Sequence, residues 1–249
     1  MTNTYAIPVA VVVLLLSASS APNAGPNEDQ FPGIRGGFTL GKALILSDDQ
    51  VIGAADQACA LRDQLTVVAA SGSPHAERLA RLTANHVTED DLKLVFKVYM
   101  VDEVNAWAMA NGCVRVYSGL LEVLTDDELQ GVLGHEIGHV KLGHTKAKMR
   151  TALLARGVRE SASGSGVGVI AAGELGGLAE TVVNAQFSQK EERAADDYGF
   201  AFLQKHSYDP SAMVRMFRKL PGKKGGLLAS HPDPESRARR IEARLKNDH

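Results

Sequence analysis

Apolar and polar positions along the chain follow helical spacing in some stretches and strict alternation in others. The clearest helical stretch is Leu124 to His144, where Thr125 is followed three residues later by Glu128. A threonine and a glutamate at this spacing form a capping box, in which each side chain accepts a hydrogen bond from the backbone amide of the other residue. The pattern therefore predicts a helix that begins at Thr125.

Capping signals predict further helices on both sides of this one. Serine stands at the capping position of residues 47–68 and of residues 73–86, and proline opens the second of these segments. A short amphipathic helix is expected after residue 210, and a basic helix over 237–246. The short helix carries an apolar stripe, interpreted as core: Met213, Met216 and Phe217. Two isolated histidines are expected at the surface or in caps: His75 and His86.

Alternation from Asp91 to Met100, with apolar residues at every second position and Lys93 and Lys97 between them, predicts a strand. Two shorter strands are expected over 106–109 and 113–117, with a turn at Asn111-Gly112. Two interpretations of this hairpin stay open. It either only supports the helix, or its edge near residues 105–110 lines a cleft and pairs with an extended peptide.

The central helix carries His135, Glu136 and His139. Residues four apart lie above one another on one helix face, so the two imidazoles can bind one metal ion while Glu136 flanks it as a general base. The structural alternative is two histidines that merely stand four apart on a core helix. Four glycines in the same stretch favour a site, because each costs about 1 kcal/mol in a helix and indicates close approach of a backbone, a metal or a substrate. They are Gly131, Gly134, Gly138 and Gly143.

A zinc site of this kind needs a third protein ligand and an open position for water. In one large protease group a glycine and a third histidine follow at fixed spacing, but Leu142 and Thr145 occupy those places here. The best candidates are Glu192 and Asp196, four apart on a second predicted helix. One of them can bind zinc while the other accepts the free ring N–H of a ligand histidine.

These motifs, with Ser230-His231-Pro232 and the run 105–119, resemble the zinc metallopeptidase family that includes HtpX, BepA and the CAAX prenyl proteases, a gluzincin family, and most nearly its LoiP-like branch. The resemblance covers roughly residues 48–245. It implies a mainly helical α+β fold of zincin type with a small sheet. It implies the following site: zinc ligands His135, His139 and Glu192; general base Glu136; Asp196 orienting a histidine or assisting proton donation; cleft residues His231 and Arg237; and substrate-pairing residues Asn105 and Ala106. In such enzymes His231 would contact the substrate carbonyl or occupy the metal in a resting form.

The chain is expected to contain a signal peptide over residues 1–24, a linker over 25–46 and one metallopeptidase domain over 47–249. The apolar run near the start is about ten residues, half of what a membrane span needs, and fits export to the periplasm or the outer side of the inner membrane. The alternative is an uncleaved apolar tail. No cysteine precedes Cys59, so a lipid anchor is not expected.

Only two cysteines occur, Cys59 and Cys113. In an exported chain they would pair and contribute on the order of 4 kcal/mol, whereas in the cytosol they would be two buried thiols. A glycine-rich stretch within residues 150–180 is expected to form small-residue helices or a flap over the cleft. The net charge of −2 gives no reason to expect nucleic-acid binding.

The predicted function is a zinc-dependent metalloendopeptidase acting on unfolded or misassembled envelope proteins, with membrane-associated envelope partners and no predicted oligomeric state. One alternative is a chaperone-like envelope factor with a structural zinc site. Its weakness is that a structural site fills the fourth coordination position with protein. The other alternative is a zinc hydrolase of non-peptide substrates.

Overall fold

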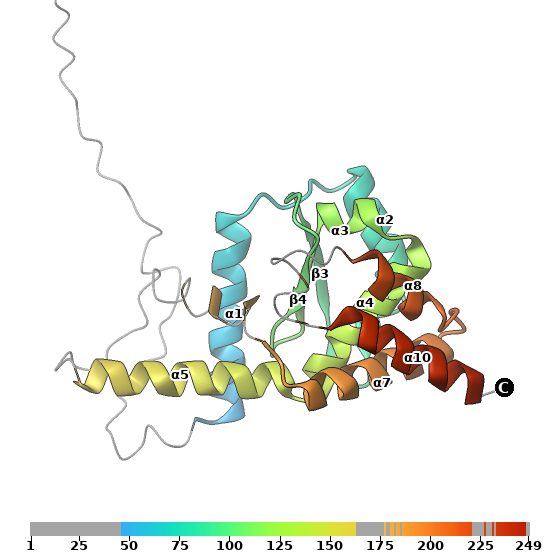
Figure 1. Cartoon of the computed structure of the whole chain (residues 1–249). Helices are drawn as coiled ribbons and strands as arrows, with labels where there is room; N and C mark the ends of the chain where they lie inside the picture. The colour runs from blue at the N-terminus through green and yellow to red at the C-terminus, as the bar shows by residue number, and fades with distance from the viewer. Residues whose placement is uncertain are drawn as a thin grey trace, which may run out of the picture.

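The computed structural model describes residues 46–162, 186–220 and 233–247, and the single positions 177, 180, 181, 183, 184, 227 and 231 (Figure 1). The predicted signal peptide, nearly all of the predicted linker and most of the glycine-rich stretch lie outside these residues. Within the described part of the chain, no helix is both long and apolar enough to cross a membrane.

The two N-terminal helices begin where their capping residues predict. Helix α1 (Asp48–Leu65) has a complete capping box at Ser47, and α2 (Pro74–Thr83) is capped by Ser73. Both end a few residues earlier than predicted. After α1 the chain becomes extended, because the Val67 carbonyl accepts a hydrogen bond from the Met100 amide and Val68 bridges to Tyr99.

The sheet has the strand order β3-β5-β4, formed by β3 (Val95–Tyr99), β5 (Cys113–Tyr117) and β4 (Ala106–Ala108). Strands β4 and β5 are the predicted hairpin, and β3 is parallel to β5. The long strand predicted from Asp91 is divided. Its first part, β2 (Leu92–Lys93), pairs instead with β1 (Thr88–Glu89), because Asp90 and Asp91 adopt positive φ angles and form a tight turn.

Residues of the hairpin alternate between two buried clusters. Ala106, Ala108 and Val114 belong to a core shared with the C-terminal helices, whereas Trp107 and Cys113 belong to a core beside α1. The sheet is therefore covered on both faces. The other helices whose bounds lie within the described ranges are α3 (Ser118–Val123), α4 (Asp126–Lys141), α5 (His144–Ala162), α7 (Gln189–Lys205), α8 (Ala212–Lys219) and α10 (Pro234–Asn247). This mainly helical α+β architecture is the predicted fold class.

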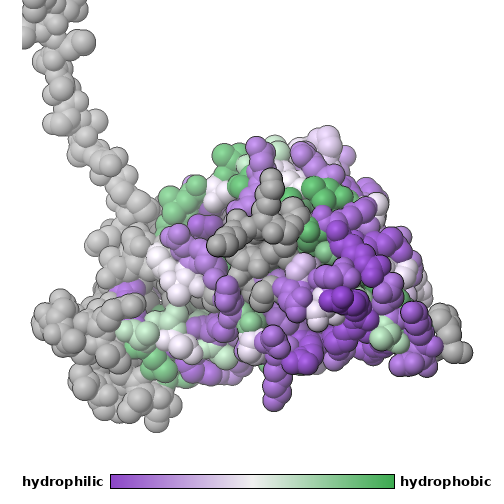
Figure 2. Space-filling model, in the orientation of Figure 1, coloured by the Kyte–Doolittle hydropathy of each residue, from purple (hydrophilic) through white to green (hydrophobic). Residues whose placement is uncertain are grey.

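Helix α4 lies at the centre, packed against α7, α8 and β4, and α10 packs on α8 (Figure 1). It begins at Thr125 with the predicted capping box. The predicted apolar stripe on α8 is buried in the core. Hydrophilic side chains dominate the part of the surface in Figure 2 that lies over α10. The C-terminal helices thus present a polar outer face and an apolar inner one.

The glycines of α4 bring α7 close to it. A Cβ atom at Gly134 would lie 2.7 Å from the Phe202 ring and 3.2 Å from the Cα atom of Gly199, and one at Gly138 would lie 3.1 Å from Tyr198. The predicted close approach of another element is confirmed at Gly134 and Gly138 but is wrong at Gly143, which lies beyond the end of α4 with a φ angle of 75° and no atom within 4 Å of its Cβ position. The close approach places the first turns of α7 directly beside the histidines of α4.

Helix α1 is fastened to the sheet at two points. Cys59 and Cys113 form a disulfide, with their Cα atoms 6.6 Å apart. One turn further along α1, the Asp63 carboxylate accepts hydrogen bonds from Lys97, Tyr99 and Arg115 at 2.7–2.9 Å.

Candidate metal centre

Four side chains from three parts of the chain converge on one buried point. His135 and His139 lie one turn apart on α4, with their Nε2 atoms 3.1 Å apart. Glu192, in the first turn of α7, places carboxylate oxygens 3.6 Å from each of these nitrogens. His231, just before α10, adds its Nδ1 atom 3.1 Å from His135 Nε2 and 2.8 Å from Glu192 Oε1. These donor atoms form a cluster that could hold a metal ion.

The arrangement around His135 fits a metal ligand. Its Nδ1 atom lies 3.0 Å from Asp196 Oδ1, so the ring proton is expected on Nδ1 and the Nε2 lone pair faces the other histidines. Ring lone pairs gathered around one point repel one another unless a proton or a cation lies between them. Imidazole nitrogens with a carboxylate oxygen are a ligand set that suits first-row transition metal ions. The residues present therefore fit such an ion.

Arg237 holds the two carboxylates of α7. Its guanidinium pairs with Glu192 Oε2 at 2.9 Å and with Asp196 Oδ2 at 3.0 Å, and the residue is only 8% exposed. Burial alone would raise the pKa of Asp196, but bonding to His135 and Arg237 lowers it to about 2. Hydrogen bonds with His139 and His231 likewise outweigh burial and hold the pKa of Glu192 well below its usual range. Both carboxylates are charged at neutral pH.

Glu136 borders the cluster without belonging to it. It is 2% exposed, lies 3.5 Å from His231 Nε2 and is close enough to Ala108 of β4 for that strand to influence its pKa. Its Oε1 atom has no hydrogen-bond partner among the described residues. Burial raises the pKa of Glu136 to about 7. This carboxylate is therefore set apart chemically from Glu192 and Asp196 and can exchange a proton near neutral pH.

The predicted substrate-pairing residues lie next to the cluster, on the side of β4. The Asn105 carbonyl is used within the sheet, where it accepts a hydrogen bond from the Tyr117 amide. Ala106 and Ala108 lie in the core that also contains residues of α4. Asn105 and Ala106 are both buried, as is Arg237, so the structure as it stands exposes none of these three predicted contact residues.

Two residues at the centre were not assigned a role from the sequence. The Phe187 ring stacks on His139 with centroids 3.9 Å apart and also faces His231 at 5.4 Å. His144 places Nδ1 3.0 Å from His139 Nδ1. In the sequence, His144 stands one residue before the place that a third histidine takes in the protease pattern considered above, whereas an aromatic residue just before a helix cap gives no such signal.

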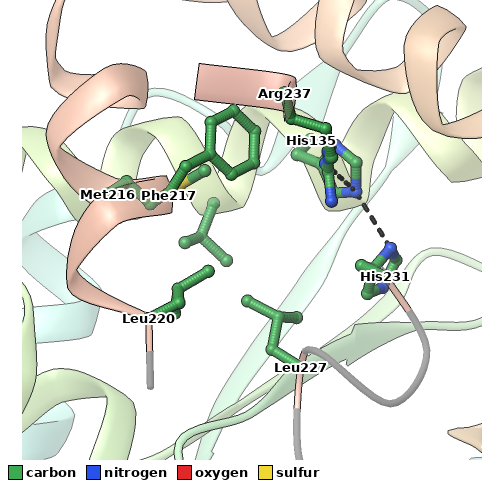
Figure 3. A pocket seen from close by; sticks show the side chains of 8 residues that line it. His135, Met216, Phe217, Leu220, Leu227, His231 and Arg237 are labelled. Carbon is green, nitrogen blue, oxygen red and sulfur yellow. Dashed lines mark hydrogen bonds between the residues drawn. The ribbon is translucent and has the colours of Figure 1, made fainter. Parts of the chain in front are cut away.

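A small pocket adjoins the cluster (Figure 3). His135, His231 and Arg237 form one side of it, and apolar side chains from α4, α8 and Leu227 form the rest. The Arg237 guanidinium also lies 4.4 Å from the centroid of the Phe217 ring. The charged groups of the centre thus pack against side chains of the apolar core.

Comparison with known proteins identifies the family. The chain is 37% identical to the metalloprotease LoiP of Escherichia coli (strain K12) over 249 residues, which covers 96% of this chain and 98% of that protein. It is 39% identical over 221 residues to the metalloprotease YcaL of the same strain, covering 85% and 86%. It is 33% identical over 174 residues to the beta-barrel assembly-enhancing protease of Yersinia pestis, covering 63% and 35%. Residues 73–245 match peptidase family M48. The resemblance drawn from the motifs is thereby confirmed, and the chain belongs to peptidase family M48, whose metal-dependent peptidase chemistry the buried cluster fits.

Proposed function

We propose that this protein is a zinc-dependent endopeptidase in which His135, His139 and Glu192 bind the metal. The observation that carries the proposal is the meeting of two imidazoles from α4 and one carboxylate from α7 beside Glu136. Zinc ligands at about 2.0–2.1 Å in tetrahedral geometry lie about 3.3 Å from one another, close to the 3.1–3.6 Å separations of these three groups. When bound, zinc lowers the pKa of a coordinated water to about 7 and polarises the substrate carbonyl.

Glu136 acts as the general base. It accepts the proton of the attacking water and delivers it to the leaving amine, so that one carboxylate serves in both steps. Its lack of a hydrogen-bond partner at Oε1 and its raised pKa support this role. Asp196 orients His135 through Nδ1, and Arg237 fixes Asp196 and Glu192 relative to each other. Arg237 would then act through these carboxylates, in place of the predicted contact with substrate.

His231 occupies the fourth corner of the cluster. The distances of its Nδ1 atom to His135 and Glu192 support the role of a metal ligand in a resting form. A substrate carbonyl would take that corner during turnover. His231 would then be displaced, and its neighbour Glu136 would gain room for the attacking water.

The substrate would be a polypeptide bound as an added strand along β4. Strand addition uses backbone hydrogen bonds and makes little demand on sequence, which suits unfolded or misassembled proteins. Of the two strands beside β5, β4 is the one that packs against α4 and reaches Glu136. Asn105 and Ala106 would pair with the peptide once the cleft opens.

We also infer that the protein works after export, in the cell envelope. The disulfide between Cys59 and Cys113 supports this location, because such bonds persist in oxidising compartments. The alternative, a chaperone-like factor with a structural metal, would have no need of an ionisable group such as Glu136 beside His231, the ligand that a substrate would displace.

The decisive variant is Glu136→Gln. Removing a general base of this kind is expected to lower casein hydrolysis by about 10²–10⁴-fold, while zinc content stays unchanged because Glu136 is not a ligand. His139→Ala is the matched comparison, expected to lose both hydrolysis and the zinc ion held with His135 and Glu192. Metal content would be measured by mass spectrometry of the folded protein. Full zinc content without hydrolysis in the wild type, or unchanged hydrolysis in Glu136→Gln, would contradict the proposal.

A further inference from the structure

A second group of metal-binding side chains lies at the opposite end of α7 from Glu192. It consists of His86, which follows α2, Glu89 of β1, and His206, which caps the C-terminus of α7. Glu89 Oε2 lies 2.9 Å from His206 Nε2 and 3.5 Å from His86 Nδ1. The prediction for His86 is wrong about the surface, because His86 and Glu89 are 1% and 3% exposed, although the His86 amide does donate to the Thr83 carbonyl at the end of α2. Phe202 and Tyr208 cover its ring.

The His86 ring is held as ligand histidines are held. Its Nε2 atom lies 3.2 Å from the Tyr208 hydroxyl, which also accepts a hydrogen bond from Gln130 of α4. Its Nδ1 atom is buried and has no hydrogen-bond partner within the described part of the chain. With the ring proton on the Tyr208 side, the Nδ1 lone pair points toward the Glu89 carboxylate, where two acceptors face each other. A cation between them removes this repulsion, and a partner on the other ring nitrogen is the usual support for a metal-bound histidine.

Hydrogen bonds and ion pairs within the protein satisfy only some of the polar atoms of His86, Glu89 and His206. Lys205 pairs with Oε1 of Glu89 and with Asp90, and so leaves Oε2 turned toward the two histidines. Without a metal, Glu89 is paired with Lys205 and His206, and the buried His86 Nδ1 atom, 3.5 Å from Glu89 Oε2, makes no hydrogen bond within the described part of the chain. The His206 side chain is 21% exposed, so an ion can reach the group from solvent.

We propose that His86, Glu89 and His206 bind a second zinc ion, one that fixes the end of α7 to the segment between α2 and β1. Two imidazoles and one carboxylate are ligands that zinc accepts, with water completing the coordination. The ion would have no part in the chemistry of hydrolysis. Because α7 also carries Glu192 and Asp196, the second ion would instead hold α7 against α4, acting at the end of α7 opposite to these two residues. The inference does not depend on the proposed catalytic centre.

The test is a count of zinc per chain in the full-length protein after dialysis against zinc and removal of the excess. The wild type is expected to retain two ions, and His206→Ala and Glu89→Gln one each. Lys205→Met is the matched control, because it removes an ion-pair partner of Glu89 but no ligand, and it should retain two. Circular dichroism would confirm that each variant is folded.

His139→Ala separates the two proposals. It is expected to keep one ion, bound at His86, Glu89 and His206, and to gain thermal stability on addition of zinc, whereas the double variant His139→Ala/His206→Ala should keep none and show no such gain. A single ion in the wild type that is lost in His139→Ala would overturn the second site and leave the first. A single ion in the wild type that is lost only in His206→Ala would support the second site and overturn the proposed catalytic one. A wild-type count of two supports the second site even if a variant fails to fold, and a count of one is assigned by whichever histidine variant loses the ion.

Discussion

Asp196 is a buried carboxylate placed to orient His135, a proposed metal ligand, without itself belonging to the metal-binding cluster. It lies 3.0 Å from His135 Nδ1 on one side and pairs with Arg237 on the other. Its lowered pKa, about 2, keeps it ionised throughout the physiological range. It therefore selects the ring tautomer of His135 that leaves Nε2 free for the ion.

Replacing Asp196 by asparagine is expected to weaken zinc binding by about 10–100-fold. An amide can present its NH₂ group to Nδ1 and would also remove one of the two carboxylates that pair with Arg237. Competition with a zinc chelator would measure the change. Asp197→Asn is the control, because the adjacent Asp197 is half-exposed and pairs only with Arg240 and Arg244 of α10 among the described ion pairs. Equal zinc affinity in the two variants would argue against the positioning role.

At the scale of single residues, the sequence predicts which side chains lie together when they belong to the same helix. His135 and His139, and Glu192 and Asp196, are each four apart on one helix, so their shared faces follow from the helical period. The packing of α4 on α7, which joins the two pairs, cannot be read from either segment alone. His86 was misassigned for the same reason, since its nearest ligand partner beyond Glu89 is His206, far along the chain.

Between elements, the seam of small residues where α4 meets α7 sets the distance between the ligands. Gly134 and Gly199 face each other across it, and a Cβ atom at Gly199 would lie 3.1 Å from the backbone nitrogen of His135. The glycines were predicted to signal close approach, but which helix approaches became evident only from the fold.

Gly134→Ala is expected to destabilise the protein by about 1–3 kcal/mol and to lower zinc affinity, because the added methyl group pushes Phe202 and α7 away from α4. Gly53→Ala provides the contrast. Gly53 lies within α1 with open space around its Cβ position, so alanine there is expected to stabilise the protein by up to about 1 kcal/mol. Urea unfolding of both variants measures these differences. If Gly134→Ala left the free energy of unfolding unchanged, the packing between α4 and α7 at this glycine would not be tight.

The attachment of α1 to the sheet predicts a specific response to acid. Burial would raise the pKa of Asp63, but hydrogen bonds from Arg115, Lys97 and Tyr99 keep it below the ordinary value of 3.8. A depressed pKa in the folded state means that the stabilisation is complete above about pH 4 and is lost as the pH falls through the folded-state pKa.

Asp63→Asn is therefore expected to lower the free energy of unfolding by about 3 kcal/mol at pH 7, since the buried Arg115 loses its charge partner. The difference from the wild type should shrink below about pH 4. Asp56→Asn, on an exposed part of the same helix, should change little at either pH. A difference between wild type and Asp63→Asn that stays constant down to pH 2 would contradict this assignment.

For the molecule as a whole, the buried ligands make the bound metal part of the folded structure. Chelation is expected to abolish hydrolysis and to lower the melting temperature, because an ion present at about a thousand times its Kd stabilises the folded state by about 4 kcal/mol. Differential scanning calorimetry with and without chelator measures the shift, and added zinc should reverse it. A melting temperature that does not respond to chelation would mean that the fold holds the cluster without an ion.

The burial of the active site has a kinetic consequence. Glu136 and His139 are 2% and 0% exposed, and Phe187 is stacked on His139, so a peptide reaches them only in a rarer, opened form of the protein. If that form made up about one molecule in a hundred, the apparent Kd for peptides would be about a hundredfold weaker than the intrinsic one. Shortening the side chain of Phe187, which stacks on His139, would then increase the turnover of short peptides. In its closed resting form the enzyme would leave folded proteins nearby uncleaved.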